Sequence, residues 1–212
     1  MSLETSKIVH YIYENFTEKK KRIFFILGTT AGCGNTYCSK KIAMAAAASV
    51  PGIASILLMD MNMYHPSLSM EAGNPENGWM TWIANDNGEN DIIDYTISIP
   101  LANSVDLLPQ GSHVSYESIP LSIFNWQTLF DKLKEKYDII IGDLPPYYQG
   151  VEARIFCEFA DSIILTVEAE VSRRPLVTQL SDSLNNAGIH IGGVVFNKRK
   201  YHIPAGIYKR LF

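Results

Sequence analysis

One short stretch, residues 23–36, constrains the fold of this chain more than any other. It begins with the apolar run Ile23–Leu27 and passes through a turn that contains Gly32 and Gly34. A near-continuous apolar run of this length is typical of a central parallel strand covered on both faces. A buried strand that leads through a glycine-containing turn into a helix is the layout of a phosphate-binding loop, whose backbone N–H groups face an anion.

This phosphate loop (residues 29–36) departs at two positions from the pattern G-x-x-x-x-G-K-[ST]. The pattern places its first glycine at Thr29, its second at Gly34, its lysine at Asn35 and its hydroxyl at Thr36. The second glycine and the hydroxyl are present, whereas the first glycine and the lysine are replaced. A ligand-free tight turn retained with the fold is the alternative to a nucleotide pocket. The candidate nucleotide-binding residues of the loop are Gly32, Cys33, Gly34, Asn35 and Thr36.

The amino-acid composition limits the classes of protein to which this chain can belong. The chain has 212 residues, of which 47% are hydrophobic and 19% charged, as expected for one α/β domain with a full core. The net charge of −4 argues against nucleic acid as the main partner. Three cysteines suit a reducing cytosol, and no apolar run approaches the ~20 residues that span a bilayer. These features predict a cytoplasmic location.

Apolar strand-like runs alternate with helical patterns along the chain. Strands are expected at 23–27, 54–59, 105–108, 139–142, 162–167 and 190–196. Helices are expected at 4–16, 37–49, 79–84, 124–136, 151–158, 173–187 and 207–212. This order predicts right-handed βαβ units and an α/β fold, a doubly wound, mostly parallel sheet with helices on both faces. We expect residues 1–22 to form a helix and a charged connector, and residues 23–212 to form a single domain.

Three predicted strands end in a polar residue. Asp60 ends the second strand, Asp143 the fourth and Asn197 the sixth. Ligands of doubly wound sheets bind beyond the carboxyl ends of the strands, where the phosphate loop also lies. The sequence therefore predicts that these three side chains converge on the loop.

Five short segments, taken in order, resemble motifs of one known family. Residues 57–68, LLMDMNMYHPSL, are similar to D-x-D-x-R-x-P-S-L, and residues 137–146, YDIIIGDLPP, are similar to Y-D-x-x-I-x-D-x-P-P. Three further segments resemble family motifs: LLPQG at 107–111, GGVVFN at 192–197 and IPAGIYKRL at 203–211. The family is the bacterial tyrosine kinase (BY-kinase) domain, the cytoplasmic ATPase of capsule and exopolysaccharide export systems. The resemblance covers nearly the whole chain and implies a P-loop NTPase fold of the SIMIBI class.

The resemblance also implies a role for each candidate residue. In the family, the loop lysine contacts the β- and γ-phosphates and the loop hydroxyl binds Mg²⁺, while strand-end carboxylates position metal and nucleophile. Carried over, Thr36, Asp60 and Asp143 would hold Mg²⁺, and the two aspartates would also be the catalytic carboxylates. Asn197 would contact the adenine edge of ATP or ADP, with turn capping as the alternative.

Three positions that carry charge in the family are neutral here. Asn35 occupies the position of the family's Lys, Asn62 that of Asp and Tyr64 that of Arg. Asn62 is equally explained as a turn residue. Phosphoryl transfer depends on electrostatic stabilisation, and losing one such contact costs ~10²–10³ in rate. The sequence therefore predicts a pseudo-enzyme with weak or absent turnover and a regulatory or scaffolding role in exopolysaccharide biosynthesis or export.

Two other functions stay open from the sequence. An active ATP-dependent tyrosine autokinase or ATPase would need a displaced lysine. Lys40 and Lys41 are near in sequence, although a turn of helix points them away from the loop mouth. A partition or septum-placement ATPase would carry a lysine where this chain has Thr30.

The resemblance implies partners as well. These are a membrane polysaccharide co-polymerase, met through its cytoplasmic tail, and further copies of the chain in a homo-oligomer. The family's oligomerisation motif E-x-x-R-x-x-R appears in softened form as Glu4, Lys7 and His10. The resemblance thus places the protein in the cytoplasm, at the inner face of the membrane through a partner or through a membrane segment outside this sequence.

Overall fold

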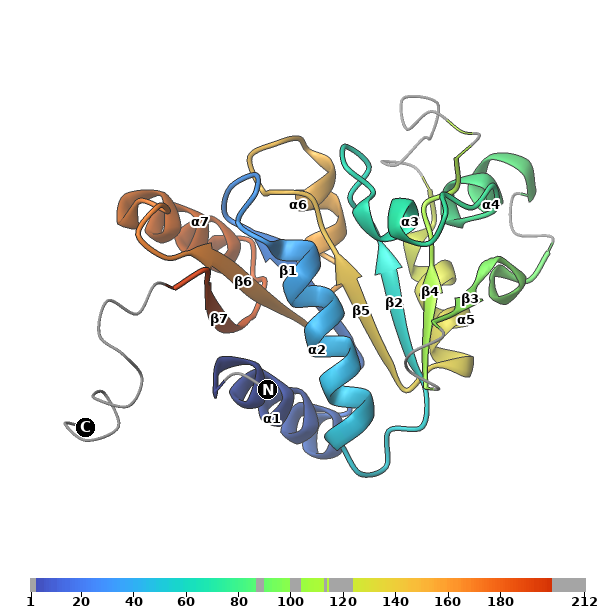
Figure 1. Cartoon of the computed structure of the whole chain (residues 1–212), viewed down its shortest axis with the longest axis horizontal. Coiled ribbons are helices and arrows are strands. Elements are labelled where there is room, and N and C mark those ends of the chain that lie inside the picture. Colours follow the sequence, from blue (N-terminus) through green and yellow to red (C-terminus); the bar gives the residue numbers. More distant parts are fainter. Residues whose placement is uncertain (1–2, 87–89, 100–103, 113, 115–123, 200–212) are drawn as a thin grey trace.

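The computed structural model describes residues 3–86, 90–99, 104–112, 114 and 124–199, which form one layered α/β body (Figure 1). Its centre is a seven-stranded sheet of order β3-β4-β2-β5-β1-β6-β7. The strands are β1 (Ile23–Gly28), β2 (Ile56–Asp60), β3 (Ile97–Ser98), β4 (Val105–Leu108), β5 (Ile139–Asp143), β6 (Ser162–Glu168) and β7 (Ile191–Asn197). Every strand pair is parallel except β3 with β4.

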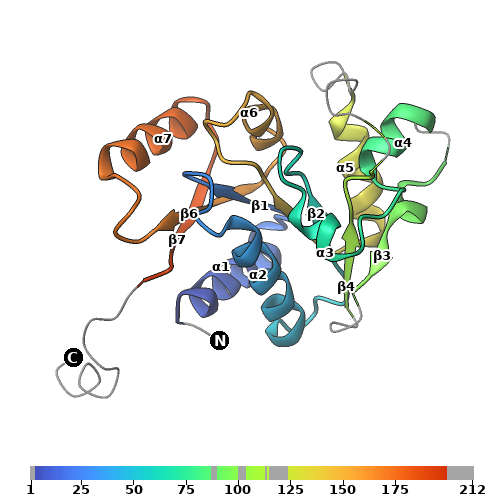
Figure 2. The same cartoon turned by 45° about the horizontal axis from the view of Figure 1, so that its top comes forward.

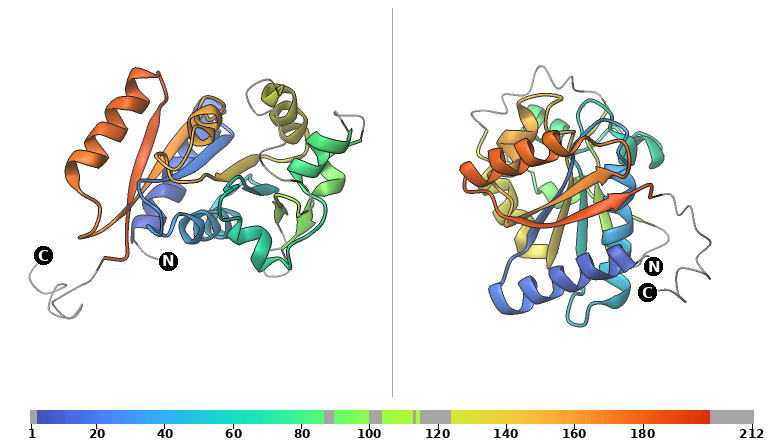
Figure 3. Two further views of the ribbon diagram at one scale, coloured as in Figure 1. Left: turned by 90° about the horizontal axis from the view of Figure 1, so that it is seen from above. Right: turned by 90° about the vertical axis from the view of Figure 1, so that its left-hand side faces the viewer.

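Helices cover both faces of the sheet (Figure 3). One face carries α1 (Leu3–Lys19) and α2 (Asn35–Ser49), which contribute to one hydrophobic core. The other carries α4 (Trp79–Asp86), α5 (Trp126–Lys136), α6 (Glu152–Cys157) and α7 (Arg174–Asn186), which contribute to a second. The predicted doubly wound, mostly parallel fold is confirmed.

The central strands are apolar because both of their faces are covered. Every residue of β1, β2 and β5 is buried, and β1 lies between β5 and β6. Alternate side chains of β1 therefore enter opposite cores: Phe24 and Ile26 pack toward α2, and Phe25 packs against Phe130 of α5. This fixes β1 in the middle of the sheet and places the loop that follows it over the centre of one sheet end.

An aromatic cluster fixes α4 and α5 beside this end of the sheet. The rings of Trp79, Trp126 and Phe156 meet edge to face, with centroids 4.9 Å to 6.1 Å apart. The indole Nε1 of Trp79 also donates a hydrogen bond of 2.7 Å to the carbonyl oxygen of Asp60. The end of β2 is thereby anchored to the core.

The first helix packs on the sheet through one apolar face. Ile8, Val9 and Ile12 are buried against the core shared with α2. Tyr11 adds a polar contact, since its hydroxyl lies 2.9 Å from the Ser162 hydroxyl of β6. The helix continues to Lys19, three residues beyond the predicted end, which shortens the charged connector to residues 20–22.

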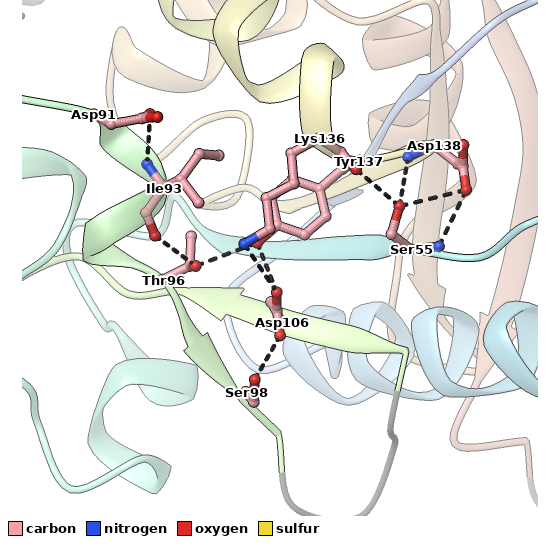
Figure 4. Close-up of polar contacts among 9 residues, drawn as sticks. All are labelled: Ser55, Asp91, Ile93, Thr96, Ser98, Asp106, Lys136, Tyr137 and Asp138. Atoms are coloured by element: carbon pink, nitrogen blue, oxygen red, sulfur yellow. Dashed lines mark hydrogen bonds and ion pairs between the residues drawn. The ribbon is translucent and has the colours of Figure 1, made fainter.

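The Tyr137–Asp138 pair organises the end of the sheet opposite the phosphate loop (Figure 4). The Asp138 carboxylate accepts hydrogen bonds from the backbone N–H groups of Ala54 (2.8 Å) and Ser55 (3.1 Å). The hydroxyl of Tyr137 donates to Asp106 of β4 at 2.7 Å, and burial raises the pKa of this phenol. The Y-D portion of the family-like segment is thus a structural contact in this chain.

Some details of the fold differ from the sequence prediction. The second strand begins at Ile56 rather than at residue 54, because Asp138 binds the two preceding N–H groups. Three short elements were not predicted: α3 (Ser67–Glu71), the 3-10 helix η1 (Ile92–Tyr95) and β3. Within the described ranges, every helix is too short or too polar to cross a bilayer. The predicted helix 207–212 and the motif at 203–211 lie outside the described residues.

Replacing Asp138 tests the contact that starts β2. Asp138→Ala removes the acceptor of two backbone N–H groups, and we expect a loss of about 1–3 kcal/mol in the free energy of unfolding. Urea denaturation measures this quantity. Asp131→Ala, which changes an exposed aspartate of α5, is the matched control, and we expect little change in its free energy of unfolding. Equal unfolding midpoints for Asp138→Ala and the control would contradict the assignment.

Candidate functional site

The connections that follow β1, β2 and β5 meet at one end of the sheet (Figures 1 and 2). Asp60 and Asp143 are the last residues of β2 and β5 and are register partners in the sheet. Asn197 ends β7. Hydrogen bonds connect Asp143 and Asn197 to the phosphate loop, and Asp60 lies beside Asp143 in the sheet. The geometry therefore brings the three strand-end residues to the loop.

The phosphate loop has the backbone shape of an anion cradle. Gly32 and Gly34 both have left-handed backbone, with φ of 77° and 87°. Gly34 is the N-cap of α2 and provides no side-chain cap for the N–H groups at this helix start. A Cβ on Gly34 would lie 2.1 Å from the Asn197 side-chain nitrogen, so glycine is required there by both conformation and space. The N–H groups of the first turn therefore remain available to an anion.

The side chain of Asn35, at the lysine position, is directed into the protein. It is 7% exposed, and its Nδ2 donates to the carbonyl oxygens of Ile26 (2.8 Å) and Leu144 (2.9 Å). The same nitrogen lies 2.7 Å from Oδ1 of Asp143. Asn35 thus joins the first turn of α2 to β1 and to the end of β5. It contributes no positive charge to the loop.

Asp143 is fully buried at the centre of this network. Its Oδ1 also accepts a hydrogen bond of 3.0 Å from Ser39, and Thr36 adds a further side-chain hydrogen bond. Burial, with a smaller contribution from the nearby charge of Asp60, raises the pKa of the Asp143 carboxyl to about 7 despite these hydrogen bonds. Among the described residues, none provides a hydrogen-bond partner for its Oδ2 atom.

Ser39 is a site residue that our reading of the sequence did not identify. Its position four residues after Asn35, and hence on the same face of α2, was the available signal. Ser39 and Asn35 approach the same carboxylate oxygen of Asp143 from successive helical turns. The hydroxyl therefore belongs to the network that holds Asp143.

Asp60 is also buried, but both of its carboxylate oxygens accept hydrogen bonds from residues that follow it closely in the sequence. Oδ2 accepts from the backbone N–H and the hydroxyl of Ser69, both at 2.8 Å, and Oδ1 accepts from the N–H of Asn62 at 3.3 Å. Burial raises the pKa of Asp60 to about 6. Asn62 itself accepts from the N–H of His65 at 3.2 Å, which favours its interpretation as a turn residue.

The other departures from the family pattern also have defined contacts. Tyr64, at the arginine position, donates its hydroxyl hydrogen to Glu152 of α6. Lys40 pairs with Glu71 at 2.5 Å, and the ammonium of Lys41 lies 5.6 Å from the ring centre of Tyr37. Lys40 and Lys41 are therefore engaged on the outside of α2, as the helical geometry predicted.

The end of β7 supports the loop from the side. Asn197 Nδ2 donates to the carbonyl oxygen of Cys33 at 2.9 Å, which supports a role in holding the turn. The next residue, Lys198, places its Nζ 2.5 Å from the carbonyl oxygen of Gly32 and 3.2 Å from Oε1 of Glu168. Lys198 and Glu168 were not predicted, and adjacency to Asn197 was the single signal for Lys198.

The donor set suits Mg²⁺ only in combination with a ligand. The described residues contain no group of three or more His, Cys, Asp or Glu side chains placed to hold a metal ion. Mg²⁺ keeps several waters and commonly binds one or two carboxylates together with phosphates. The partner-free Oδ2 of buried Asp143 and the neighbouring hydroxyl of Thr36 fit such a partial site.

Comparison with known proteins supports a P-loop fold of this kind. No model of a known protein family matches the chain. It is 25% identical over 143 residues to the putative tyrosine-protein kinase CapB of Staphylococcus aureus, an alignment that covers 67% of this chain but only 61% of CapB. The fold matches the kinase domain of the Escherichia coli tyrosine kinase ETK, with a TM-score of 0.77 and 17% identity, and the match covers 95% of this chain and 78% of the solved kinase-domain chain.

A second structural match is a protein that was solved with a bound nucleotide. The septum site-determining protein MinD of Pyrococcus horikoshii, solved with Mg-ADP, matches with a TM-score of 0.64 and 21% identity. The match covers 89% of this chain and 76% of MinD. Both structural matches show the predicted P-loop NTPase type of fold.

Truncating Asn35 tests its role in the network. Asn35→Ala leaves buried acceptors on Ile26, Leu144 and Asp143 without this donor, and we expect a loss of about 2 kcal/mol in the free energy of unfolding. Asn185→Ala, at an exposed asparagine of α7, is the control in the same urea titration. An unchanged midpoint for Asn35→Ala would show that the amide does not hold these elements together.

The two buried carboxyls predict a stability that falls with rising pH. Their folded pKa values, about 6 and about 7, exceed the ordinary 3.8, so between these limits the folded protein binds protons that the unfolded chain has released. The free energy of unfolding should therefore decrease from about pH 4 to about pH 8, where Asp143 is largely ionised, and then level off. Urea midpoints in EDTA buffers measure this dependence.

Two variants distinguish the contribution of Asp143 to this pH dependence from the contributions of other titrating groups. Asp143→Asn removes one of the two buried carboxyls and should flatten the slope between pH 5 and 8. Asp131→Asn should keep the wild-type slope, because Asp131 is exposed and its pKa is lowered by Lys134. Parallel slopes for wild type and Asp143→Asn would contradict the raised pKa of Asp143.

Proposed function

We propose, from the premise that the chain is a BY-kinase-like P-loop domain, that it is a degenerate member with a regulatory or scaffolding role in exopolysaccharide biosynthesis or export. In this proposal it binds ATP or ADP with Mg²⁺ and turns ATP over weakly or not at all. The observation that carries the proposal is the hydrogen bond between Asn35 and Asp143.

This contact replaces a charged interaction by a neutral one. Where the family pattern has a lysine, a buried amide binds Asp143 and two carbonyl groups. Asp60 and Asp143 meanwhile bring carboxyl groups to the site whose pKa values are raised by burial. Charge that develops on a transferred phosphoryl group would thus meet no cation at the lysine position of the loop. Little turnover is the expected consequence.

Nucleotide binding draws on features that do not need the lysine. The N–H groups at the start of α2 carry no side-chain cap, and the backbone at Gly32 and Gly34 is already left-handed. In our proposal Thr36 and Asp143 would hold Mg²⁺, with Asp60 beside them. When bound, the ion would neutralise charge on the β- and γ-phosphates.

The proposed partners are a cytoplasmic tail of a membrane polysaccharide co-polymerase and further copies of the chain. Exposed apolar side chains on the connections at the site end of the sheet support an interaction surface there. They are Tyr37, Met70, Tyr148, Val151 and Val171. A regulatory protein that binds nucleotide without turnover could present this surface differently in its two states.

An active ATP-dependent autokinase or ATPase is the second candidate. The contact between Lys198 and the carbonyl of Gly32 favours it, because a lysine at the loop is the component that Asn35 does not supply. A partition-type ATPase is the third candidate, and such a protein would carry a lysine at the position that Thr30 occupies in this chain. Measured turnover separates the first two candidates.

Calorimetry with Mg·ADP and Mg·ATP, followed by phosphate release and autophosphorylation assays, tests the proposal. We expect measurable binding and a turnover at least ~10²-fold below that of a catalytically active BY-kinase domain assayed alongside. Turnover equal to that of the active domain would support the second candidate and contradict the first.

Restoring the lysine gives a sharper form of this test. Asn35→Lys should raise the affinity for Mg·ATP, because it returns a positive charge to the loop. Asn35→Met is the matched control, as it has nearly the length of lysine without the charge, and its affinity should not rise. Equal affinities of the two variants would show that other parts of the pocket have lost the ability to bind phosphates.

A further inference from the structure

Lys198 lies directly after β7, beside the phosphate loop. Its Nζ is 2.5 Å from the carbonyl oxygen of Gly32 and 3.2 Å from Glu168. Its backbone is left-handed, with φ of 56°, an uncommon conformation for lysine. Asn197 holds the next loop carbonyl, that of Cys33, so two consecutive residues of the chain fasten two consecutive residues of the loop.

The ammonium of Lys198 has room to move toward a ligand. Its side chain is 49% exposed, and a Cβ built on Gly32 would have no atom within 4 Å, so the loop surface is open at this point. Lys40 and Lys41, the other candidates, contact Glu71 and the ring of Tyr37, whereas Lys198 contacts the phosphate loop itself at Gly32. Lys198 is therefore the better placed of the three lysines to reach a phosphate.

Buried atoms beside the loop also indicate an incomplete site. Oδ2 of Asp143 and Oδ1 of Asn35 have no hydrogen-bond partner among the described residues, although both side chains are more than nine-tenths buried. Unpaired buried acceptors are unfavourable unless a donor, a water or a cation completes them. A ligand that arrived with Mg²⁺ and its water shell would supply a cation and donors to these two acceptors.

We propose that Lys198 pairs with the phosphate chain of a bound nucleoside diphosphate or triphosphate and so takes over the charge that Asn35 does not provide. Glu168 is the counterion of Lys198 when no nucleotide is present. This inference rests on the proposed nucleotide binding and names the cation responsible for it. A multiply charged phosphate chain competes with the single carboxylate of Glu168 for the ammonium.

Calorimetric titrations of the full chain with adenosine, Mg·ADP and Mg·ATP test the inference. Lys198→Met keeps the aliphatic stem, and it should weaken Mg·ADP and Mg·ATP binding about tenfold while leaving adenosine binding unchanged. Glu168→Gln should strengthen Mg·ADP binding a few-fold, because it releases the ammonium and removes a negative charge. Lys41→Met is the matched control and should bind like the wild type.

Thermal unfolding without nucleotide accompanies each variant, so that a folding defect is recognised. Lys198→Arg should restore Mg·ADP affinity if charge is what matters. Equal Mg·ADP affinity of Lys198→Met and wild type would overturn the inference while leaving nucleotide binding intact. Equal weakening of adenosine and Mg·ADP would also overturn it, since Lys198 would then only hold the loop. A wild-type chain that binds none of the three ligands would overturn the proposed function as well.

Discussion

The hydrogen bond from Asn35 to Asp143 is the interaction on which the candidate site depends. A single amide nitrogen at the start of α2 reaches the ends of β1 and β5 together, and thereby fixes the helix over the phosphate loop. A buried carboxylate without a cation is costly, and this one is stabilised by neutral donors while its pKa rises. At the position where the family pattern would place a lysine, the loop is therefore held by neutral hydrogen bonds.

The rest of the fold makes that arrangement possible. Parallel pairing of β2, β5 and β1 brings their carboxyl ends to one edge, and hydrophobic cores on both faces keep the strands in register. At the opposite edge, Asp138 binds the backbone that leads into β2, and Tyr137 binds Asp106 of β4. A rigid sheet with fixed ends keeps the loop positioned independently of any bound ligand.

The architecture and the convergence of Asp60, Asp143 and Asn197 could be predicted, because periodicity and strand-end position depend on local sequence. The direction of the Asn35 side chain could not be predicted, because it depends on the Asp143 carboxylate and the Leu144 carbonyl, which lie far away in the sequence. Lys198 was missed for a similar reason: its loop contact joins residues far apart in the chain. Short elements such as β3 escape prediction because two residues carry no period.

A crystal structure with Mg·ADP would test the central claim most directly. The account predicts phosphates on the backbone N–H groups of residues 32–36, with Asn35 Nδ2 still within hydrogen-bond distance of Asp143. A side chain of Asn35 that turns away from Asp143 to contact phosphate would contradict the account. A structure at saturating nucleotide concentration in which the nucleotide binds away from the phosphate loop would also contradict it.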